Sequence, residues 1–519
     1  MTTTTPSTSR AIDPVKYVLD GGSLTLDALD AGLGKRVRVA VKDSVWRRIE
    51  KSSQAVQRIA AGDAPAYGVN TGVGHLCTKR IPHDQLGRLQ TNLIVSHAVG
   101  VGPPAPPEIV RWMMLLKIHA LTHGVSGVSR KTVECLMRML QADILPVIPT
   151  QGSLGASGDL APLAHMVLPM IGEGVVEVDG ERRSAKEAFA RAGIEPVTLG
   201  PKEGLALVNG TQFMAAYAAA IVVRTRRLVK HADVIASMSL EGCAASVKPF
   251  DERLHRLRPH PGAIETADNV RRLMQDSSIL ASHADCSRVQ DPYSLRCIAQ
   301  VHGAARDALR HAAAVVETEI NSVTDNPLIF DDEVISGGSF HGEPLAFVLD
   351  YLAIALSELA SISERRTYLL LSGVAGLPLL LIKESGVNSG LMVVQYTAAA
   401  LVSENKGLCT PASVDSIPTS LGQEDHVSMG ARAAVKCLQI LENAETVLAI
   451  EQLCAAQALD FRVPLLPGLG PRIAHAELRK DITHAAADRP LGDDIRLSLA
   501  LLRSQRILRA VEARLGPLQ

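Results

Sequence analysis

One glycine-rich stretch, Gly152 to His165, contains residues that can build an electrophile from the protein's own backbone. The amide nitrogen of Gly158 can attack the carbonyl carbon of Ala156 if the chain bends tightly, because both residues offer little steric hindrance. A five-membered imidazolone ring results. Loss of water from this ring and from the Ser157 side chain leaves an exocyclic methylene group that accepts amines or electron-rich rings. This chemistry requires neither a metal nor a separate coenzyme.

The residues around the triplet predict a strained turn that is anchored by a helix. Gly152 and Gly155 can adopt backbone angles that other residues avoid. Asp159 is expected to cap the following helix, and Pro162 suits the first turn of that helix. An isolated Ala-Ser-Gly triplet is more often an ordinary turn, so the triplet alone does not establish the chemistry.

The longer sequence resembles the aromatic amino acid ammonia-lyases that depend on 4-methylideneimidazole-5-one (MIO). The resemblance extends from about Leu19 to beyond Leu453. It implies an MIO group formed from Ala156, Ser157 and Gly158, with no metal. Five further blocks occur in the family's order: Tyr67-Gly-Val-Asn-Thr-Gly, Asn209-Gly-Thr-Gln, Gln290-Asp-Pro-Tyr-Ser-Leu-Arg, Ser322-Val-Thr-Asp-Asn-Pro and Gln423-Glu-Asp-His-Val-Ser-Met.

The composition favours a helical protein that acts on a small molecule. Apolar residues make up 47% of the 519 residues but aromatic residues only 3%, so Ala, Leu, Val and Ile must build the core, as in close-packed helices. A net charge of −1 argues against a nucleic-acid-binding surface and against a polybasic membrane surface. The eight cysteines show no metal-ligand spacing, which predicts buried, reduced thiols.

The N-terminus is polar and has no apolar signal segment, so we expect a cytoplasmic protein whose residues 1–12 are disordered. Residues 13–210 are expected to form a mixed α/β domain that carries the MIO group, and residues 211–519 a helical bundle. Two apolar runs, 367–382 and 386–402, are too interrupted to span a membrane and predict helices buried on every side.

Residue periodicity predicts the individual elements. Before residue 204 these are strands at 23–26 and 36–41, helices at 44–61, 107–123 and 129–142, and a hairpin around Asp179-Gly180. After residue 204 strand patterns end, and long helices are expected at 211–238, 294–322, 343–372, 391–406, 430–458 and 495–515. The resemblance implies a mainly α, ammonia-lyase and fumarase-like architecture. It also implies a homotetramer in which three subunits build each active site.

The reaction implied by the resemblance is elimination of ammonia from an α-amino acid, which needs a base and an activated amino group. Tyr67 matches the family's base. To act as a phenolate at neutral pH, its pKa must fall from about 10 to about 7, which requires nearby positive charge or hydrogen bonds. The alternative is a tyrosine that only packs beneath its loop.

Further site residues follow from the resemblance. Arg296 matches the residue that binds the substrate carboxylate, with a structural salt bridge as the alternative. Tyr293 and Gln290 would lie on the same face as Arg296 and hold the electrophile and the substrate. Asn209 matches an amide that bonds the imidazolone oxygen, although Asn-Gly is also a common turn. Phe340 matches an aromatic residue near the electrophile, with core packing as the alternative.

The pair Ser96-His97 and the residue Glu424 resemble those of histidine ammonia-lyases rather than phenylalanine or tyrosine lyases. Glu424 could accept an imidazole N–H while His97 bonds the other ring nitrogen. A phenyl ring would leave both groups unpaired, which can reject phenylalanine by about 10⁴-fold. We therefore expect conversion of L-histidine to trans-urocanate. The alternative is that His97 and Glu424 satisfy each other or the backbone.

Several residues depart from the family pattern and keep other functions open. Ser339 stands where Asn is usual, Ile298-Ala299 where Gln-Pro is usual, and His75 ends the tyrosine loop, where Phe-Gly is usual. The alternatives are a phenylalanine or tyrosine ammonia-lyase and an aromatic 2,3-aminomutase. A non-enzymatic helical scaffold would require an uncyclised Ala156–Gly158 loop.

Overall fold

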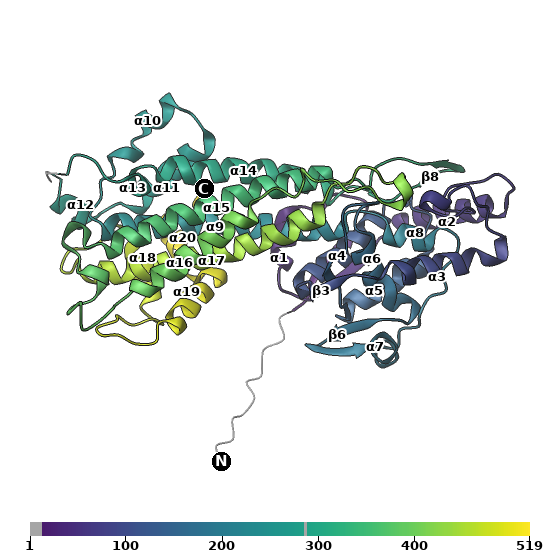
Figure 1. Ribbon diagram of the computed structural model, residues 1–519, viewed down its shortest axis with the longest axis horizontal. Helices are drawn as coiled ribbons and strands as arrows, with labels where there is room; N and C mark the ends of the chain where they lie inside the picture. Colours follow the sequence, from purple (N-terminus) through teal and green to yellow (C-terminus); the bar gives the residue numbers. More distant parts are fainter. Residues whose placement is uncertain (1–12, 285–287) are drawn as a thin grey trace, which may run out of the picture. The chain divides into compact units, whose positions relative to one another are not determined.

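The computed structural model describes residues 13–284 and 288–519, and most of them are helical (Figure 1). The mainly α fold class is therefore confirmed. The expected disordered segment, residues 1–12, lies outside the described residues. Contacts divide the chain into unit 1 (Met1–Val223, Ala313–Phe347 and Ala412–Val435) and unit 2 (Arg224–Ala312, Val348–Pro411 and Lys436–Gln519). Neither unit is contiguous in sequence, and the division at 210/211 stays a prediction.

Unit 1 combines short helices with small sheets. Its helices are α1 (Leu26–Gly32), α2 (Asp43–Ala61), α3 (Leu86–His97), α4 (Pro107–Leu121), α5 (Arg130–Gln141), α6 (Leu160–Val167), α7 (Ala185–Ala192) and α8 (Glu203–Val208). Its parallel pair is β1 (Val15–Leu19) with β2 (Val37–Val41). Its antiparallel pairs are β3 (Val101–Pro104) with β5 (Pro149–Gln151), β4 (Leu145–Pro146) with β6 (Val175–Val178), β6 with β7 (Glu181–Ser184), and β8 (Leu328–Phe330) with β9 (Glu333–Ile335).

Local sequence explains most of these elements. The predicted hairpin is confirmed as β6–β7, and its turn residues Asp179 and Gly180 have φ values of 53° and 80°, as a primed turn requires. The strand predicted at 23–26 is wrong, because Thr25 Oγ1 accepts a hydrogen bond from the Ala28 N–H and starts α1 instead. The expectation of no strands after residue 204 is also wrong, since β8 and β9 form a short hairpin.

Unit 2 contains most of the long helices, several of which begin in unit 1 or end there. The unit boundaries fall within α9 (Gln212–Gly242), α14 (Ile298–Glu319), α15 (Glu343–Leu371) and α17 (Gly430–Asp460). The remaining helices of unit 2 are α10 (Glu252–Leu257), α11 (Pro261–Leu273), α12 (Ser278–Ser282), α13 (Tyr293–Arg296), α16 (Met392–Leu408), α18 (Leu469–Leu478), α19 (Gly492–Ser504) and α20 (Arg506–Leu515).

Buried ionic groups connect the long helices within unit 2, where these helices lie side by side (Figure 1). Arg366 on α15 pairs with Glu451 on α17, with 2.8 Å between Nη2 and Oε2. Asp233 on α9 accepts hydrogen bonds from Arg306 (2.6 Å) and His302 (2.8 Å) on α14. An unpaired buried charge is strongly destabilising, so these pairs determine which helix faces can meet.

Two of the predicted long helices are interrupted. The helix expected at 294–322 is split at Cys297 into α13 and α14. The helix expected at 495–515 is split at Gln505, which has a φ of 59° and separates α19 from α20. A left-handed residue stops the helical hydrogen-bond ladder, and the apolar pattern alone does not reveal it.

The apolar runs 367–382 and 386–402 are not helices buried on every side. In the first run, α15 ends at Leu371, and the residues that follow form turns, with Gly373 at a φ of 79°. On α16, only Val394, Ala398 and Asn405 are buried within the chain. One helix, α15, is long and apolar enough to cross a membrane by length and composition, and 61% of its most apolar window is buried.

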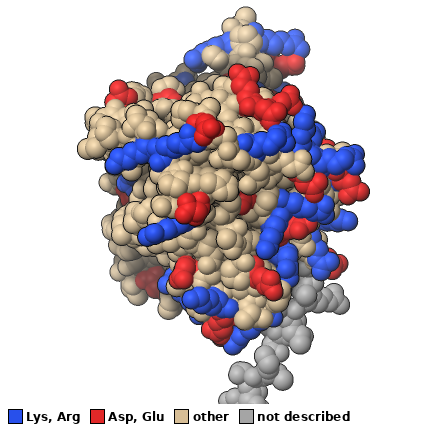
Figure 2. Space-filling view, turned by 90° about the vertical axis from the view of Figure 1, so that its right-hand side faces the viewer, with Lys and Arg blue, Asp and Glu red and all other residues tan. Residues whose placement is uncertain are grey.

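The surface charge agrees with the expectation from the sequence, and the burial of the cysteines agrees with it in part. Figure 2 shows basic and acidic side chains intermixed on one face of the molecule, without a continuous patch of either sign. The seven cysteines in the described residues are unpaired, and Cys286 lies outside those residues. Cys77, Cys297 and Cys409 are partly exposed, so the expectation of buried thiols is correct only for the other four described cysteines.

His231 on α9 generates a pH prediction. It is fully buried, neither ring nitrogen has a hydrogen-bond partner, and burial lowers its pKa to about 4. Because its unfolded-state pKa is about 6.5, the unfolded state binds the proton more tightly, and stability falls as the pH drops from about 6.5 to about 4. The His231→Leu variant should lose up to about 3 kcal/mol of this acid sensitivity in urea unfolding measured at pH 7 and pH 4.5.

The exposed His311 provides the control, because His311→Leu should keep the acid sensitivity of the wild type. Equal acid sensitivity in His231→Leu and wild type would contradict the assignment.

Candidate active site

The Ala156–Gly158 triplet forms a tight turn in unit 1. The Gly158 N–H donates to the Gly155 carbonyl oxygen at 3.2 Å, and Ser157 has a φ of 51°. A positive φ is uncommon for a residue with a side chain and folds the backbone back on itself. The turn therefore closes residues 155–158 into a tight loop, as a reaction between neighbouring backbone groups would require.

Close backbone approaches hold this turn in place. A Cβ on Gly158 would lie 2.2 Å from the Gly210 carbonyl oxygen, and a Cβ on Gly155 would lie 2.4 Å from Ser428 Oγ. The Gly210 N–H donates to the Ser157 carbonyl oxygen at 3.3 Å. Only glycine fits at positions 155 and 158 without moving these neighbours.

Asp159 anchors the turn differently from the sequence expectation. It precedes α6, but its side chain makes no capping hydrogen bond to that helix. Its carboxylate instead accepts hydrogen bonds from the Met214 N–H (3.0 Å), in the first turn of α9, and from Ser153 Oγ (3.3 Å). Asp159 thus occupies the predicted N-cap position of α6, and its carbonyl oxygen accepts from the Leu163 N–H at 2.9 Å, but its carboxylate bonds the start of α9 instead of capping α6. Burial raises the pKa of Asp159 to about 7.

Glu424 contacts the turn from the segment that precedes α17. Its Oε1 accepts a hydrogen bond from Ser157 Oγ at 3.2 Å, and its Oε2 accepts one from Thr419 Oγ1 at 3.0 Å. The Thr419 N–H also donates to the Glu424 carbonyl oxygen at 2.9 Å. Nearby, the Met429 N–H donates to the Leu154 carbonyl oxygen at 3.0 Å, which joins the two segments.

Tyr67 lies close to Glu424 and is partly buried. Its hydroxyl oxygen accepts a hydrogen bond from the Gly74 N–H at 3.1 Å. Burial raises the pKa of Tyr67, and the charge of Glu424 raises it further, whereas the bond from Gly74 lowers it. No cationic side chain is among the groups that shift this pKa in the described residues, so the positive charge expected beside Tyr67 is not supplied by these contacts.

Internal hydrogen bonds fix the conformation of the loop that carries Tyr67. Asn70 Oδ1 accepts from the Ala66 N–H at 2.7 Å, and Thr71 Oγ1 accepts from the Gly68 N–H at 3.2 Å. These bonds satisfy the loop backbone internally, while Val69 is buried in a cluster with residues of α2 and α3. These contacts hold the backbone on both sides of Tyr67 in place.

His97 is the last residue of α3, and it lies close enough to Glu424 for that carboxylate to affect its pKa. Burial lowers the pKa of His97, while the Leu93 carbonyl oxygen and Glu424 raise it. Its Nδ1 lies 3.0 Å from Ser96 Oγ. No hydrogen bond joins the side chains of His97 and Glu424, both of which are described, so the two do not satisfy each other directly.

Asn209 follows α8 and is only 2% exposed. Its side-chain Oδ1 is buried without a hydrogen-bond partner. Its carbonyl oxygen accepts a hydrogen bond from Lys117 Nζ at 2.7 Å, and burial lowers the pKa of Lys117 to about 8. Lys117 and Thr419 were not predicted from the sequence. The only signal for Lys117 is its place within the apolar run 112–118 of α4. Phe340 is partly buried in unit 1, between β9 and α15.

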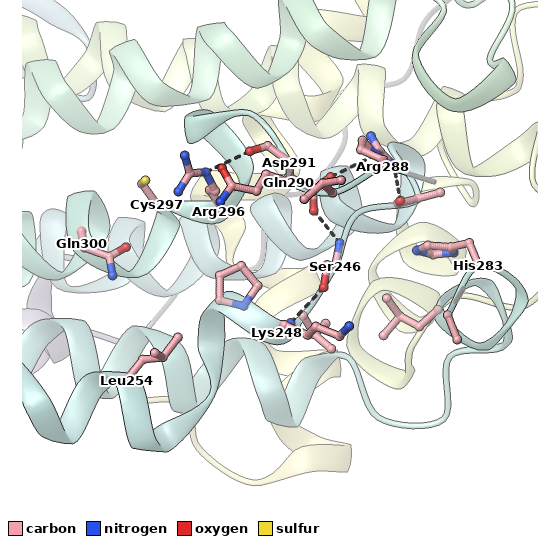
Figure 3. Close-up of a pocket in the computed structure, with 16 residues that line it drawn as sticks. Ser246, Lys248, Leu254, His283, Arg288, Gln290, Asp291, Arg296, Cys297 and Gln300 are labelled. Carbon is pink, nitrogen blue, oxygen red and sulfur yellow. Dashed lines mark hydrogen bonds and ion pairs between the residues drawn. The ribbon is translucent and has the colours of Figure 1, made fainter. Parts of the chain in front are cut away.

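The other three predicted residues belong to unit 2. Gln290 and Arg296 line a pocket of about 620 Å³, which Figure 3 shows. Arg296 Nε donates to the Asp291 carbonyl oxygen at 3.0 Å, and its guanidinium lies 4.4 Å from the centre of the Tyr293 ring. Helix α13 begins at Tyr293, so Gln290 precedes the helix instead of sharing its face. Arg296 thus has a cation–π contact in place of a structural salt bridge.

The chain matches the family model described as aromatic amino acid lyase over residues 24–480. It belongs to the aromatic amino acid lyase family, whose members act on carbon–nitrogen bonds. It is 50% identical to the histidine ammonia-lyase of Gloeobacter violaceus, over 96% of this chain and 98% of that protein.

Solved structures agree with this assignment. The histidine ammonia-lyase from Trypanosoma cruzi has a TM-score of 0.89 and 40% identity, over 97% of this chain and 96% of the other. The tyrosine aminomutase from Streptomyces globisporus has a TM-score of 0.91 and 35% identity, over 98% of this chain and 100% of the other. The resemblance and the ammonia-lyase architecture inferred from the sequence are therefore confirmed.

In this lyase, Thr419 is a positioning residue for Glu424. Thr419→Val removes the hydroxyl bonded to Glu424 Oε2 and keeps the side-chain shape. Loss of this hydrogen bond to a carboxylate should cost about 1.5–3 kcal/mol of binding free energy for the substrate. We expect the KM for the amino acid substrate to rise about tenfold or more with a smaller change in kcat. Thr419→Ser keeps the hydroxyl and should restore the wild-type KM. Equal KM values in the Val and Ser variants would refute this role.

Proposed function

We propose that this protein is an ammonia-lyase that converts L-histidine to trans-urocanate. The observation that carries the proposal is the position of the Glu424 carboxylate, which lies within hydrogen-bond distance of the Ser157 side chain, the proposed reactive centre, and near His97. An imidazole N–H can pair with this carboxylate, whereas a phenyl ring would leave it desolvated and unpaired. The relatives named histidine ammonia-lyase support the same substrate.

The reactive group is proposed to be an MIO ring formed from Ala156, Ser157 and Gly158. The residues present fit such a ring, since the turn leaves no room for a Cβ at Gly158 and the buried Asn209, whose amide N–H groups can donate to a ring oxygen, directly precedes Gly210, which contacts the turn. When formed, the ring supplies an electrophile for the substrate amino group, or for the aromatic ring in an older proposal. Metal ions are not needed for this step.

Each remaining side chain then has a defined task. Tyr67 accepts the β-proton at its phenolate oxygen, and His97, beside Ser96, bonds the second imidazole nitrogen. Phe340 lines the pocket near the reactive group. The contacts of Tyr67 in this chain raise its pKa. The charge that lowers it must therefore come from the bound substrate or from another subunit.

The carboxylate-binding residues are proposed to come from other subunits of a homotetramer. Arg296 would grip the substrate carboxylate, with Tyr293 and Gln290 beside it. The apolar side chains left exposed on α15 and α16 support assembly, because solvated patches of this kind mark subunit interfaces. They include Tyr351 (50% exposed), Ile354 (44%), Val393 (57%) and Tyr396 (55%).

The location is proposed to be the cytoplasm. The unpaired cysteines of the described residues support a reducing compartment. We propose that α15 is a core helix of the assembly, since 61% of its most apolar window is already buried.

The substrate is tested by incubating the full-length protein with L-histidine, L-phenylalanine and L-tyrosine and following conjugated product by absorbance. We expect kcat/KM for histidine to exceed that for phenylalanine by at least about 10³-fold. Glu424→Gln should lose most of this preference. Product from phenylalanine or tyrosine alone would refute the substrate, and a β-amino acid would indicate the aminomutase alternative.

The reactive group is tested by intact mass spectrometry. Ring closure and Ser157 dehydration should leave the protein lighter than its sequence by two water molecules. Ser157→Ala cannot lose its hydroxyl and should lack the second loss. A wild-type mass equal to that of the unmodified sequence would refute the MIO proposal and, with an inactive protein, would indicate a non-enzymatic scaffold.

A further inference from the structure

We propose that His341, Glu343 and His426 form a binding site for a divalent transition-metal ion in unit 1. One ligand atom from each residue lies within 4.8 Å of the other two. The rings of His341 and His426 are stacked, with centroids 5.7 Å apart and an interplanar angle of 28°. The site neighbours the proposed substrate-binding region, because His341 follows Phe340 and His426 lies two residues from Glu424. Binding of a metal ion here does not require the MIO ring.

Hydrogen bonds do not explain the convergence of the three side chains, among which the structure gives one ion pair, His341 with Glu343, that requires a protonated imidazole. Glu343 Oε2 is buried without a hydrogen-bond partner and lies 3.9 Å from His341 Nδ1, too far for a hydrogen bond. Among the described residues, no hydrogen bond is made by the imidazole of His341 or of His426. A buried, unpaired carboxylate oxygen is costly, and a bound cation would remove that cost.

The backbone holds two of the ligands against the third. His341 and Glu343 flank Gly342, at which a Cβ would lie 2.5 Å from Met214 Cε and 3.1 Å from Ser428 Oγ. The Gly342 backbone therefore packs directly on the segment that carries His426.

The ligand set selects the class of metal. Two imidazoles and one carboxylate are typical of Zn²⁺ and related ions, whereas Mg²⁺ and Ca²⁺ prefer oxygen ligands alone. Three protein ligands leave a fourth position for water. The sequence analysis expected no metal site, because His341 and His426 are distant in the chain and only the fold brings them together.

The test is titration of the chelator-treated, full-length protein with Co²⁺, followed by its visible absorption bands, and competition by Zn²⁺. We expect saturation at one ion per chain. His426→Gln and Glu343→Gln should each weaken Zn²⁺ affinity by about tenfold or more. His83→Gln, an exposed histidine elsewhere in unit 1, should leave the affinity unchanged.

His426 is exposed, so its replacement tests the site even if Glu343→Gln fails to fold. Absence of saturable binding, or equal affinity in wild type and His426→Gln, would overturn the proposal.

Discussion

The contact between Gly158 and Gly210 is the constraint on which the site depends. The two backbones approach so closely that a Cβ on Gly158 would overlap the Gly210 carbonyl oxygen. This approach requires the positive φ of Ser157 and places Asn209, next to Gly210, beside the turn. The strain of the turn is thus maintained by packing on both sides, as expected where strained backbone serves a function.

Polar groups beneath the turn are buried for the same reason. Asp159 bonds the start of α9, and Lys117 bonds the carbonyl oxygen of Asn209, so each satisfies a backbone group that would otherwise be unpaired. Their burial shifts both pKa values toward neutrality, upward for Asp159 and downward for Lys117. Two buried ionisable groups therefore lie beside the proposed electrophile, and the Glu424 carboxylate approaches Ser157 from another segment.

Both compact units contain paired buried ions, such as Lys202 with Asp325 in unit 1, and unpaired buried polar atoms. Unit 2 pairs its buried ions, such as Arg366 with Glu451, and so defines how its helices pack. Unit 1 leaves several polar atoms unpaired, including the Asn209 side-chain oxygen and a carboxylate oxygen of Glu343. Unpaired buried atoms are uncommon, so the two at Asn209 and Glu343 are candidates for contact with a bound group.

The sequence by itself determined the helical class, most helices, the β6–β7 hairpin and the residues of the turn, because periodic burial and turn chemistry are local properties. Only the tertiary structure decided that Glu424, 267 residues from Ser157, bonds its hydroxyl, and that Thr419 orients that carboxylate. It also decided that the Asp159 carboxylate accepts a hydrogen bond from the first turn of α9, and that Gln505 separates α19 from α20. Such contacts depend on how distant segments pack, and no pattern within either segment records that packing.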